Sequence, residues 1–180
     1  MFAPPVGRVI YCYGQYQSAF DAMSNVEFVQ GPDYERLLDP SVPTLLVLDD
    51  LMSHPSLELV KLFTVTAHHS NVSVFFVVHN IFYPHPSFRT AMLNTQYVLL
   101  FRSVRGLSQV TALARQIAPS GSGRARRIVE AYQDATATPY TYLLIDLHPQ
   151  TPDYLRLRAE ILPGEGDEAY GCRLSTAYKY

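Results

Sequence analysis

Two short apolar runs of the sequence end in polar side chains that can do chemistry. One run of four apolar residues precedes Asp49 and Asp50, and a second precedes His79 and Asn80. In open parallel sheets, ligands bind beyond the carboxyl ends of the strands. Carboxylates at such a place are hard oxygen ligands of the kind that Mg²⁺ prefers. An Asp at a strand end also starts turns and caps helices, so the pattern leaves both interpretations open.

The same pattern is typical of the Mg²⁺-binding strand of P-loop nucleotide hydrolases. There the first acid holds the water shell of the metal and the second polarises the attacking water. Such enzymes also need a phosphate-binding loop, GxxxxGK[ST], between a strand and a helix. The nearest string, residues 118–125, has Ala118, Arg124 and Ala125 in place of the first Gly, the Lys and the hydroxyl residue. A predicted helix precedes it, so we interpret it as a linker.

Other catalytic and metal-binding patterns find no support in the sequence. His68 and His69 are adjacent, so on a helix they would point about 100° apart and could not share a metal ion. His54, His85 and His148 lie in Pro-flanked turns, and no GxSxG motif is present. We interpret the histidines as surface or hydrogen-bonded residues.

Length and composition indicate one α/β domain in a reducing, intracellular compartment. The chain has 180 residues, of which 48% are hydrophobic and 17% charged, enough to fill a core. Cys12 and Cys172 lie far apart, which argues against a zinc site or a disulfide framework. No apolar run is long enough to span a bilayer, so no membrane partner is expected.

The net charge of −2 gives no overall attraction to nucleic acid, so contact with DNA would need a local basic patch. The basic residues nearest to such a patch are Arg124, Arg126 and Arg127, with Arg102 and Arg105 earlier in the chain. A solvated helix start is the alternative interpretation of this cluster.

Apolar runs alternate with amphipathic stretches, which predicts the elements of an α/β sheet protein. The predicted strands are Arg8–Tyr13, Val26–Val29, Thr44–Leu48, Ser73–Val78, Tyr97–Phe101, Tyr142–Leu147 and an edge strand, Leu155–Leu162. Two predicted helices begin near Ser56 and near Arg126, and two more are capped by Ser87 and Ser108.

A series of strings in a consistent order carries a family resemblance. They are Pro4-Pro5, Arg8–Gln15, Leu45–Leu51, His68–Phe76, Phe88–Thr90, Tyr97–Phe101, Leu113–Gln116, Glu130–Tyr132, Tyr142–Asp146 and Leu155–Arg158. Over residues 4–163 the chain resembles the genome-packaging ATPases of the FtsK/HerA superfamily, in particular those of Polinton (Maverick) transposons and related double-stranded DNA viruses.

The resemblance implies a three-layer, P-loop NTPase-like α/β fold with a mostly parallel sheet. The core would span residues 1–163 and a loosely ordered tail residues 164–180. In intact relatives, Mg²⁺ and ATP are the cofactors, and hydrolysis drives double-stranded DNA into a capsid. The expected partners are further copies of the chain, complete ATPase subunits and DNA. The expected location is the host nucleus or a virus assembly site.

The resemblance also implies roles for single residues. Asp49 would be the acid on the magnesium side and Asp50 the acid that activates water. His79, followed by Asn80, stands where the superfamily commonly has a Gln that senses the γ-phosphate. Arg105 resembles a recurrent arginine that follows the fifth strand, for which an inter-subunit role is expected.

The chain departs from the family at its beginning. Family members open with a strand, the phosphate loop and a helix, and this chain resembles their core without that unit. We therefore expect the chain alone to be catalytically inactive and to hold Mg²⁺ and ATP loosely or not at all. In the family the missing strand lies inside the sheet. We therefore expect two strands, among them the run Phe75–Val78, to keep an unpaired edge.

Two other functions remain open at this point. The chain could be a non-catalytic module that associates with complete ATPase subunits. It could instead be an unrelated flavodoxin-like or receiver-like domain with Asp49 and Asp50 as its acidic pocket. Such a fold does not explain the sequence after residue 100.

Overall fold

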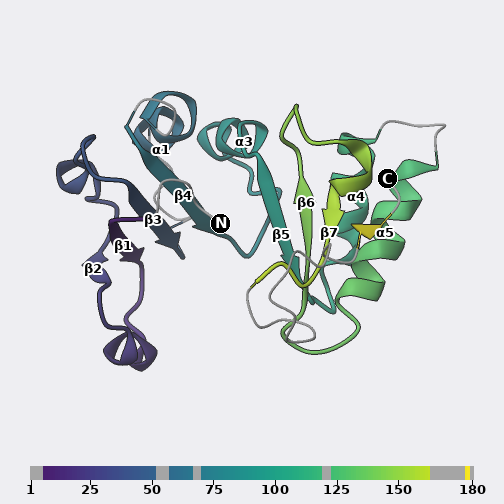
Figure 1. The fold of residues 1–180 in the computed structure, drawn as a ribbon, viewed down its shortest axis with the longest axis horizontal. Coiled ribbons are helices and arrows are strands. Elements are labelled where there is room, and N and C mark those ends of the chain that lie inside the picture. Colours follow the sequence, from purple (N-terminus) through teal and green to yellow (C-terminus); the bar gives the residue numbers. More distant parts are fainter. Residues whose placement is uncertain (1–5, 52–56, 67–69, 119–122, 163–176, 179–180) are drawn as a thin grey trace. The chain divides into compact units, whose positions relative to one another are not determined.

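The computed structural model of the chain describes residues 6–51, 57–66, 70–118, 123–162 and 177–178. It divides into two compact units, residues 1–94 and 95–180, which we call the N-terminal and C-terminal units. Each unit contains a sheet and helices, so the α/β class is confirmed (Figure 1). A single P-loop core over residues 1–163 stays a prediction. Among the described residues, no helix combines the length and the apolar character needed to cross a bilayer.

The N-terminal unit contains a parallel sheet of four strands in the order β2-β1-β3-β4. The strands are β1 (Arg8–Tyr13), β2 (Glu27–Gln30), β3 (Thr44–Asp49) and β4 (Val72–Val77). The apolar runs predicted all four of them to within one residue at each end. The register places Tyr13 of β1 beside Asp49 of β3, and Asp49 beside Val77 of β4.

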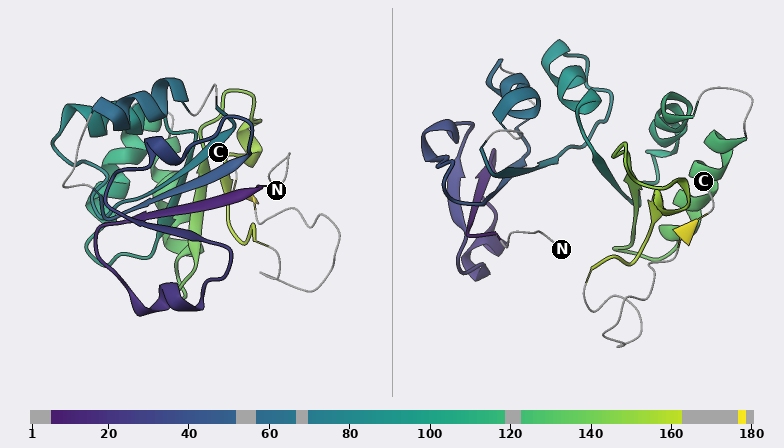
Figure 2. Two further views of the ribbon diagram at one scale, coloured as in Figure 1. Left: turned by 90° about the vertical axis from the view of Figure 1, so that its left-hand side faces the viewer. Right: turned by 45° about the horizontal axis from the view of Figure 1, so that its top comes forward.

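One face of this sheet forms the core of the unit. Helices α1 (Leu57–Lys61) and α3 (Pro86–Leu93) and the π-helical turn η3 (Leu62–Thr66) cover this face (Figure 2). Because successive strand residues point to opposite faces, every second strand residue is buried or partly buried here. The core is built from Ile10, Cys12, Leu46, Leu48, Val72, Leu59, Leu62 and Ala91.

The opposite face carries Asp49 and an aromatic cluster. The short 3-10 helix η1 (Ser18–Ala22) brings Phe20 onto Phe28 of β2, with ring centroids 4.7 Å apart. Tyr11 of β1 packs on both rings, at 5.2 Å and 5.5 Å. This cluster supports the face at β1 and β2, whereas Val77 of β4 remains 43% exposed.

The C-terminal unit contains an antiparallel sheet in the order β5-β6-β7-β8. The strands are β5 (Tyr97–Phe101), β6 (Tyr142–Asp146), β7 (Leu157–Arg158) and β8 (Ala177–Tyr178). Helices α4 (Leu107–Ile117) and α5 (Arg124–Ala135) lie between β5 and β6 in sequence and side by side in space (Figure 1). Strand β6 is buried along its whole length, and an apolar run of this kind is compatible with either direction of pairing, so the sequence did not predict the antiparallel pairing.

The predicted edge strand Leu155–Leu162 is wrong over most of its length. Only Leu157 and Arg158 pair with β6, after the 3-10 turn η4 (Asp153–Leu155). The alternation correctly places Leu157 in the core, but Glu160 has a φ of 55°, which ends the extended backbone. The predicted tail, residues 164–180, lies outside the described residues except for β8.

The predicted starts of α4 and α5 were late by about two residues. Helix α4 begins at Leu107, with Gly106 as its N-cap in place of the predicted Ser108, and α5 begins at Arg124 instead of near Arg126. At α3 the capping side chain is His85, whose Nδ1 accepts a hydrogen bond from the backbone N–H of Ser87 at 3.2 Å. The predicted cap at α3 was Ser87, which is the donor instead.

One side chain joins helix α5 to the end of β5. Tyr132 is 4% exposed, and its hydroxyl donates a hydrogen bond to the carbonyl of Phe101 at 3.1 Å. The same hydroxyl accepts a hydrogen bond from the backbone N–H of Ser103 at 3.0 Å. Both backbone groups lie where β5 ends and the chain turns toward α4.

We predict that Tyr132→Phe lowers the free energy of unfolding by about 2 kcal/mol, because two backbone groups then lose their partner. The control is Tyr140→Phe, at a side chain that is 94% exposed, for which a change of about 0.5 kcal/mol or less is expected. Denaturant unfolding measures both variants. Equal stabilities for the two variants would contradict a structural role of the Tyr132 hydroxyl.

Candidate functional site

Asp49 ends β3 and is 9% exposed. Its Oδ2 accepts a hydrogen bond from the Tyr11 hydroxyl at 2.9 Å. Burial raises the pKa of Tyr11 to about 12, and the hydrogen bond to Asp49 and the charge of Asp49 act in the same direction. The phenol therefore stays neutral at physiological pH and holds one carboxylate oxygen, which leaves Oδ1 for a second ligand.

Asp50 follows Asp49 on an exposed bend with a φ of 54°, a left-handed conformation that Asp tolerates better than most residues. The bend touches the end of β1. The backbone N–H of Gly14 donates to the carbonyl of Asp49 at 3.1 Å. A Cβ at Gly14 would lie 2.8 Å from the carbonyl oxygen of Asp50, so a side chain there would push the two strand ends apart. Gly14 thus permits the close approach of the two strand ends.

The two acids lie at the topological switch point of the N-terminal sheet. From β1 the chain passes to β2 on one side and then to β3 on the other side of β1. In open parallel sheets such a reversal leaves a crevice at the carboxyl ends of the strands, and ligands bind there. Asp49 and Asp50 stand at this edge, beside Gly14.

His79 and Asn80 follow the neighbouring strand. Because Val77 lies beside Asp49, His79 comes two residues beyond that pair, and it is exposed. Asn80 has a local role, since its Oδ1 accepts a hydrogen bond from the backbone N–H of Phe82 at 2.9 Å. This turn shapes the loop before α3. His79 is therefore the better placed of the two for contact with a ligand.

The five arginines proposed for DNA or subunit contacts lie in the C-terminal unit, and all are exposed. They are Arg102, Arg105, Arg124, Arg126 and Arg127. Nε of Arg126 lies 2.7 Å from Oε1 of Glu130, one turn along α5. Nη2 of Arg124 lies 3.9 Å from Oδ2 of Asp153. Nη1 of Arg102 donates to the carbonyl of Ala137 at 3.2 Å. Part of this positive charge is therefore balanced locally.

A second strand-end acid, Asp146, has a cation as its partner. Asp146 ends β6 and is 3% exposed. Its Oδ2 lies 2.7 Å from Nη2 of Arg158 on β7, and its Oδ1 accepts a hydrogen bond from the backbone N–H of His148 at 3.0 Å. Asp146 therefore starts a turn and pairs two strands, the structural role that a strand-end Asp commonly has.

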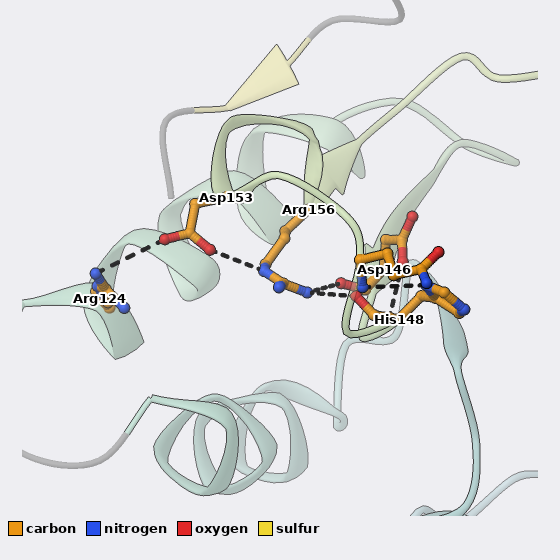
Figure 3. Close-up of polar contacts among 6 residues, drawn as sticks. Arg124, Asp146, His148, Asp153 and Arg156 are labelled. Atoms are coloured by element: carbon orange, nitrogen blue, oxygen red, sulfur yellow. Dashed lines mark hydrogen bonds and ion pairs between the residues drawn. The ribbon is translucent and has the colours of Figure 1, made fainter.

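Arg156 completes this network (Figure 3). Its Nη1 donates to the carbonyls of Asp146 and His148, both at 3.1 Å, and its Nε donates to Oδ1 of Asp153 at 3.0 Å. Figure 3 shows the side chain of Arg156 reaching from Asp153 to the turn after β6. The roles of Asp146, Asp153, Arg156 and Arg158 were not predicted from the sequence. The available signal was a strand-end Asp followed by arginines at alternate positions, 156 and 158.

The described residues offer two adjacent carboxylates to a metal ion, and no group of three or more His, Cys, Asp or Glu among them could hold one. Asp49 and Asp50 would leave most of the shell of Mg²⁺ to water or phosphate. His54, His68 and His69 lie outside the described residues. A cavity of about 230 Å³, lined by residues that include Tyr34, Glu35 and Glu58, contains none of the predicted site residues.

Comparison with known proteins identified no relative. A scan against protein-family models, a search of curated proteins and a search of solved structures each found no match to this chain.

The pH dependence of the free energy of unfolding above pH 9 tests whether the Tyr11 hydroxyl is buried and bonded to Asp49. The pKa of Tyr11 is raised from 10.0 to about 12, and burial raises that of Cys12 from 9.0 to about 11. The unfolded chain therefore loses these protons first as the pH rises. Their contribution is complete below pH 9 and is lost as the pH approaches 12.

We predict that the denaturation midpoint falls between pH 9 and pH 11. It should fall less steeply in Tyr11→Phe, because one of the groups with a raised pKa, which also include Cys12 and the buried Tyr34, is then gone. Chemical denaturation at a series of pH values measures both slopes. Equal slopes for the two proteins would show that the Tyr11 hydroxyl titrates normally in the folded chain.

The ion pair of Asp146 can be compared with an exposed pair in the same unit. Asp146→Asn keeps the acceptor for His148 but removes the charge opposite Arg158, whose side chain is 26% exposed. We predict a loss of about 2 kcal/mol in the free energy of unfolding, since partial exposure screens the pair. Glu130→Gln, which breaks the exposed pair with Arg126, should cost about 0.5 kcal/mol or less. Denaturant unfolding measures both variants. Equal losses in the free energy of unfolding would refute the structural role of Asp146.

Proposed function

We propose that the carboxyl edge of the N-terminal sheet is the Mg²⁺ side of an ATP site, and that the chain belongs to a DNA-packaging ATPase of the FtsK/HerA kind. The observation that carries this proposal is the position of Asp49 and Asp50 at the switch point of a parallel sheet. The hydrogen bond from neutral Tyr11 leaves the negative charge of Asp49 in place. A divalent cation is the ligand that such a site favours.

The residues present fit the metal but not the triphosphate. Asp49, through Oδ1, and Asp50 would hold the water shell of Mg²⁺, whose charge assists phosphoryl transfer when it is bound. The printed sequence has no GxxxxGK[ST], and its nearest string, residues 118–125, belongs to the C-terminal unit. Three missing charge-assisted hydrogen bonds of roughly 1.5–3 kcal/mol each would weaken a micromolar site to millimolar or beyond. We therefore expect no hydrolysis by this chain alone.

The sheet edges support both this proposal and a second candidate function. Among the described strands, β4 ends one sheet and β5 ends the other. The family resemblance led us to expect two such edges, left by a strand that carries the phosphate loop. The same edges favour a non-catalytic module that associates with complete ATPase subunits, because an unpaired strand edge is a docking site for another strand.

Double-stranded DNA is the proposed cargo, and Arg102, Arg105 and the first turn of α5 are its proposed contacts. That turn carries Arg124, Arg126 and Arg127 and no acidic residue, although cations at a helix N-terminus oppose the helix dipole. The helix dipole therefore does not favour these charges, and the pair of Arg126 with Glu130 balances only part of them, which supports a contact with phosphate. Arg105 in an inter-subunit role and His79 as γ-phosphate sensor belong to the same proposal, as does a location in the host nucleus or at a virus assembly site.

We predict weak binding of a divalent metal ion at Asp49 and Asp50, and no ATP hydrolysis. The probe is Mn²⁺, which broadens the NMR signals of nearby amides. Broadening should centre on Gly14, Asp50 and His79. Asp50→Asn should weaken Mn²⁺ binding by at least about tenfold, since it removes one of two carboxylates.

The matched control is Asp39→Asn, which removes an exposed carboxylate of the same unit in the loop before β3, at the amino ends of the strands. It should leave Mn²⁺ binding unchanged. Broadening centred elsewhere, or equal effects of the two substitutions, would contradict the metal site. If the chain alone hydrolysed ATP and Asp50→Asn abolished that activity, our expectation that the residues present do not hold the triphosphate would be wrong.

A further inference from the structure

A small cavity lies beside the core of the N-terminal unit. Its volume is about 230 Å³, less than the roughly 300–1,000 Å³ of pockets that hold drug-sized ligands. Among the described residues, its lining consists of Tyr34, Glu35, Leu38, Pro40, Glu58, Leu62, Thr66 and Ser70. A ligand of this cavity must therefore be small, and it would meet both apolar and acidic side chains.

The lining comes from two segments, one between β2 and β3 and the other between β3 and β4. The first supplies Tyr34 and the 3-10 turn η2 (Glu35–Leu37), and the second supplies α1 and η3. The segments meet where Nδ2 of Asn71 donates a hydrogen bond to the carbonyl of Pro40 at 3.2 Å. Pro40 precedes β3 and Ser70 precedes β4, so the cavity reaches the amino ends of these strands. The acids of the proposed metal site stand at the opposite, carboxyl ends.

The Tyr34 hydroxyl has no hydrogen-bond partner among the described residues, although the side chain is only 3% exposed. Burial raises the pKa of this phenol, and the charges of Glu35 and Glu58 act in the same direction. The hydroxyl therefore stays protonated and lies in the field of two carboxylates that line the same cavity. Because buried polar groups in proteins are nearly always hydrogen-bonded, this hydroxyl calls for a partner from outside the chain.

The charge of the cavity favours a cation as that partner. Glu35 is exposed, and its carboxylate forms no ion pair or hydrogen bond with the described residues. Glu58 of α1 is the other acidic residue of the described lining, which contains no Lys or Arg. A metal ion fits less well, since no group of three or more His, Cys, Asp or Glu among the described residues could hold one. Leu38 and Leu62 offer apolar surface to a hydrocarbon chain.

We propose that this cavity binds a small organic cation that carries a primary ammonium group on a short apolar chain. The ammonium group donates a hydrogen bond to the hydroxyl oxygen of Tyr34, and Glu35 attracts its positive charge. A hydrogen bond from a charged donor is stronger than one between neutral groups, so the buried phenol gains a partner that water replaces only in part. The inference goes beyond the nucleotide site proposed above and does not rest on it.

The probe is butylammonium, the protonated form of 1-butylamine, and 1-butanol is the neutral control with the same chain. In an amide NMR titration, butylammonium should shift the signals of Glu35, Leu38 and Thr66. A dissociation constant in the millimolar range is expected for so small a ligand. 1-Butanol should bind more weakly by about tenfold or more, because it lacks the charge.

Two variants test the residues that hold the ammonium group. Tyr34→Phe should weaken butylammonium binding by about tenfold, yet it should not lower the free energy of unfolding, because no hydrogen bond within the protein is lost. Glu35→Gln should weaken binding by about threefold or more at low salt, since it removes an attractive charge. The matched control is Asp21→Asn, which removes an exposed carboxylate of η1 on the opposite face of the sheet and should leave binding unchanged.

Four results would overturn the proposal. Absence of shifts around the cavity, or equal binding of butylammonium and 1-butanol, shows that the cavity does not select an ammonium group. Full binding by Tyr34→Phe shows that water alone satisfies the phenol, and a loss of stability in this variant shows that the hydroxyl has a partner within the chain. Displacement of butylammonium by an equal concentration of Mg²⁺ shows a metal site instead.

The two proposals fail separately. Asp50→Asn should leave butylammonium binding unchanged, and Tyr34→Phe should leave Mn²⁺ binding at Asp50 unchanged, because the two places lie at opposite ends of the strands.

Discussion

The close contact between Gly14 and the Asp49–Asp50 bend is the constraint on which the rest of the N-terminal unit depends. It sets the approach of β1 to β3 at their carboxyl ends, where one hydrogen bond and the absence of a Cβ let the two backbones meet. That approach brings the Tyr11 hydroxyl to Asp49, and it leaves Asp50 in a left-handed bend that faces solvent. The chemistry proposed for this edge therefore follows from backbone packing.

Two aspartates at strand ends show how a partner decides what a carboxylate can do. Asp146 faces a guanidinium and a backbone amide, so its charge is compensated and it fastens β6 to β7. Asp49 accepts its hydrogen bond from a neutral phenol, which orients the carboxylate without cancelling its charge. A divalent cation gains much more at the second kind of acid. This contrast is the physical reason for assigning a site to Asp49 and a structural role to Asp146.

The two edge strands of the N-terminal sheet, β2 and β4, differ in length, charge and exposure. Strand β2 is short and carries an ion pair, whereas β4 is longer, uncharged and partly exposed on one face. The unprotected backbone groups of β4 run along its outer edge, while the acids stand at the carboxyl ends of the strands. Association through a strand edge and the proposed metal site would therefore use different surfaces.

The sequence by itself determined the strands of the chain and the placement of two acids at a strand end. The runs Arg8–Tyr13 and Tyr97–Phe101 became β1 and β5 with the same bounds, because β-branched and aromatic residues favour the extended backbone of a strand. The parallel sheet at Asp49 agreed with the sequence pattern, which left open whether the acid would cap a turn or face a ligand.

Only the tertiary structure decided the direction of pairing and the partners of the polar groups. The antiparallel order of the C-terminal sheet, the turn at Glu160 and the bond from Tyr11 to Asp49 join residues distant in sequence or depend on one backbone angle. Apolar periodicity records which side of a strand is buried, but it carries no information on the direction of the neighbouring strand. For the same reason, Asp49 and Asp146 are alike in sequence and differ only in the residue that folding places opposite each of them.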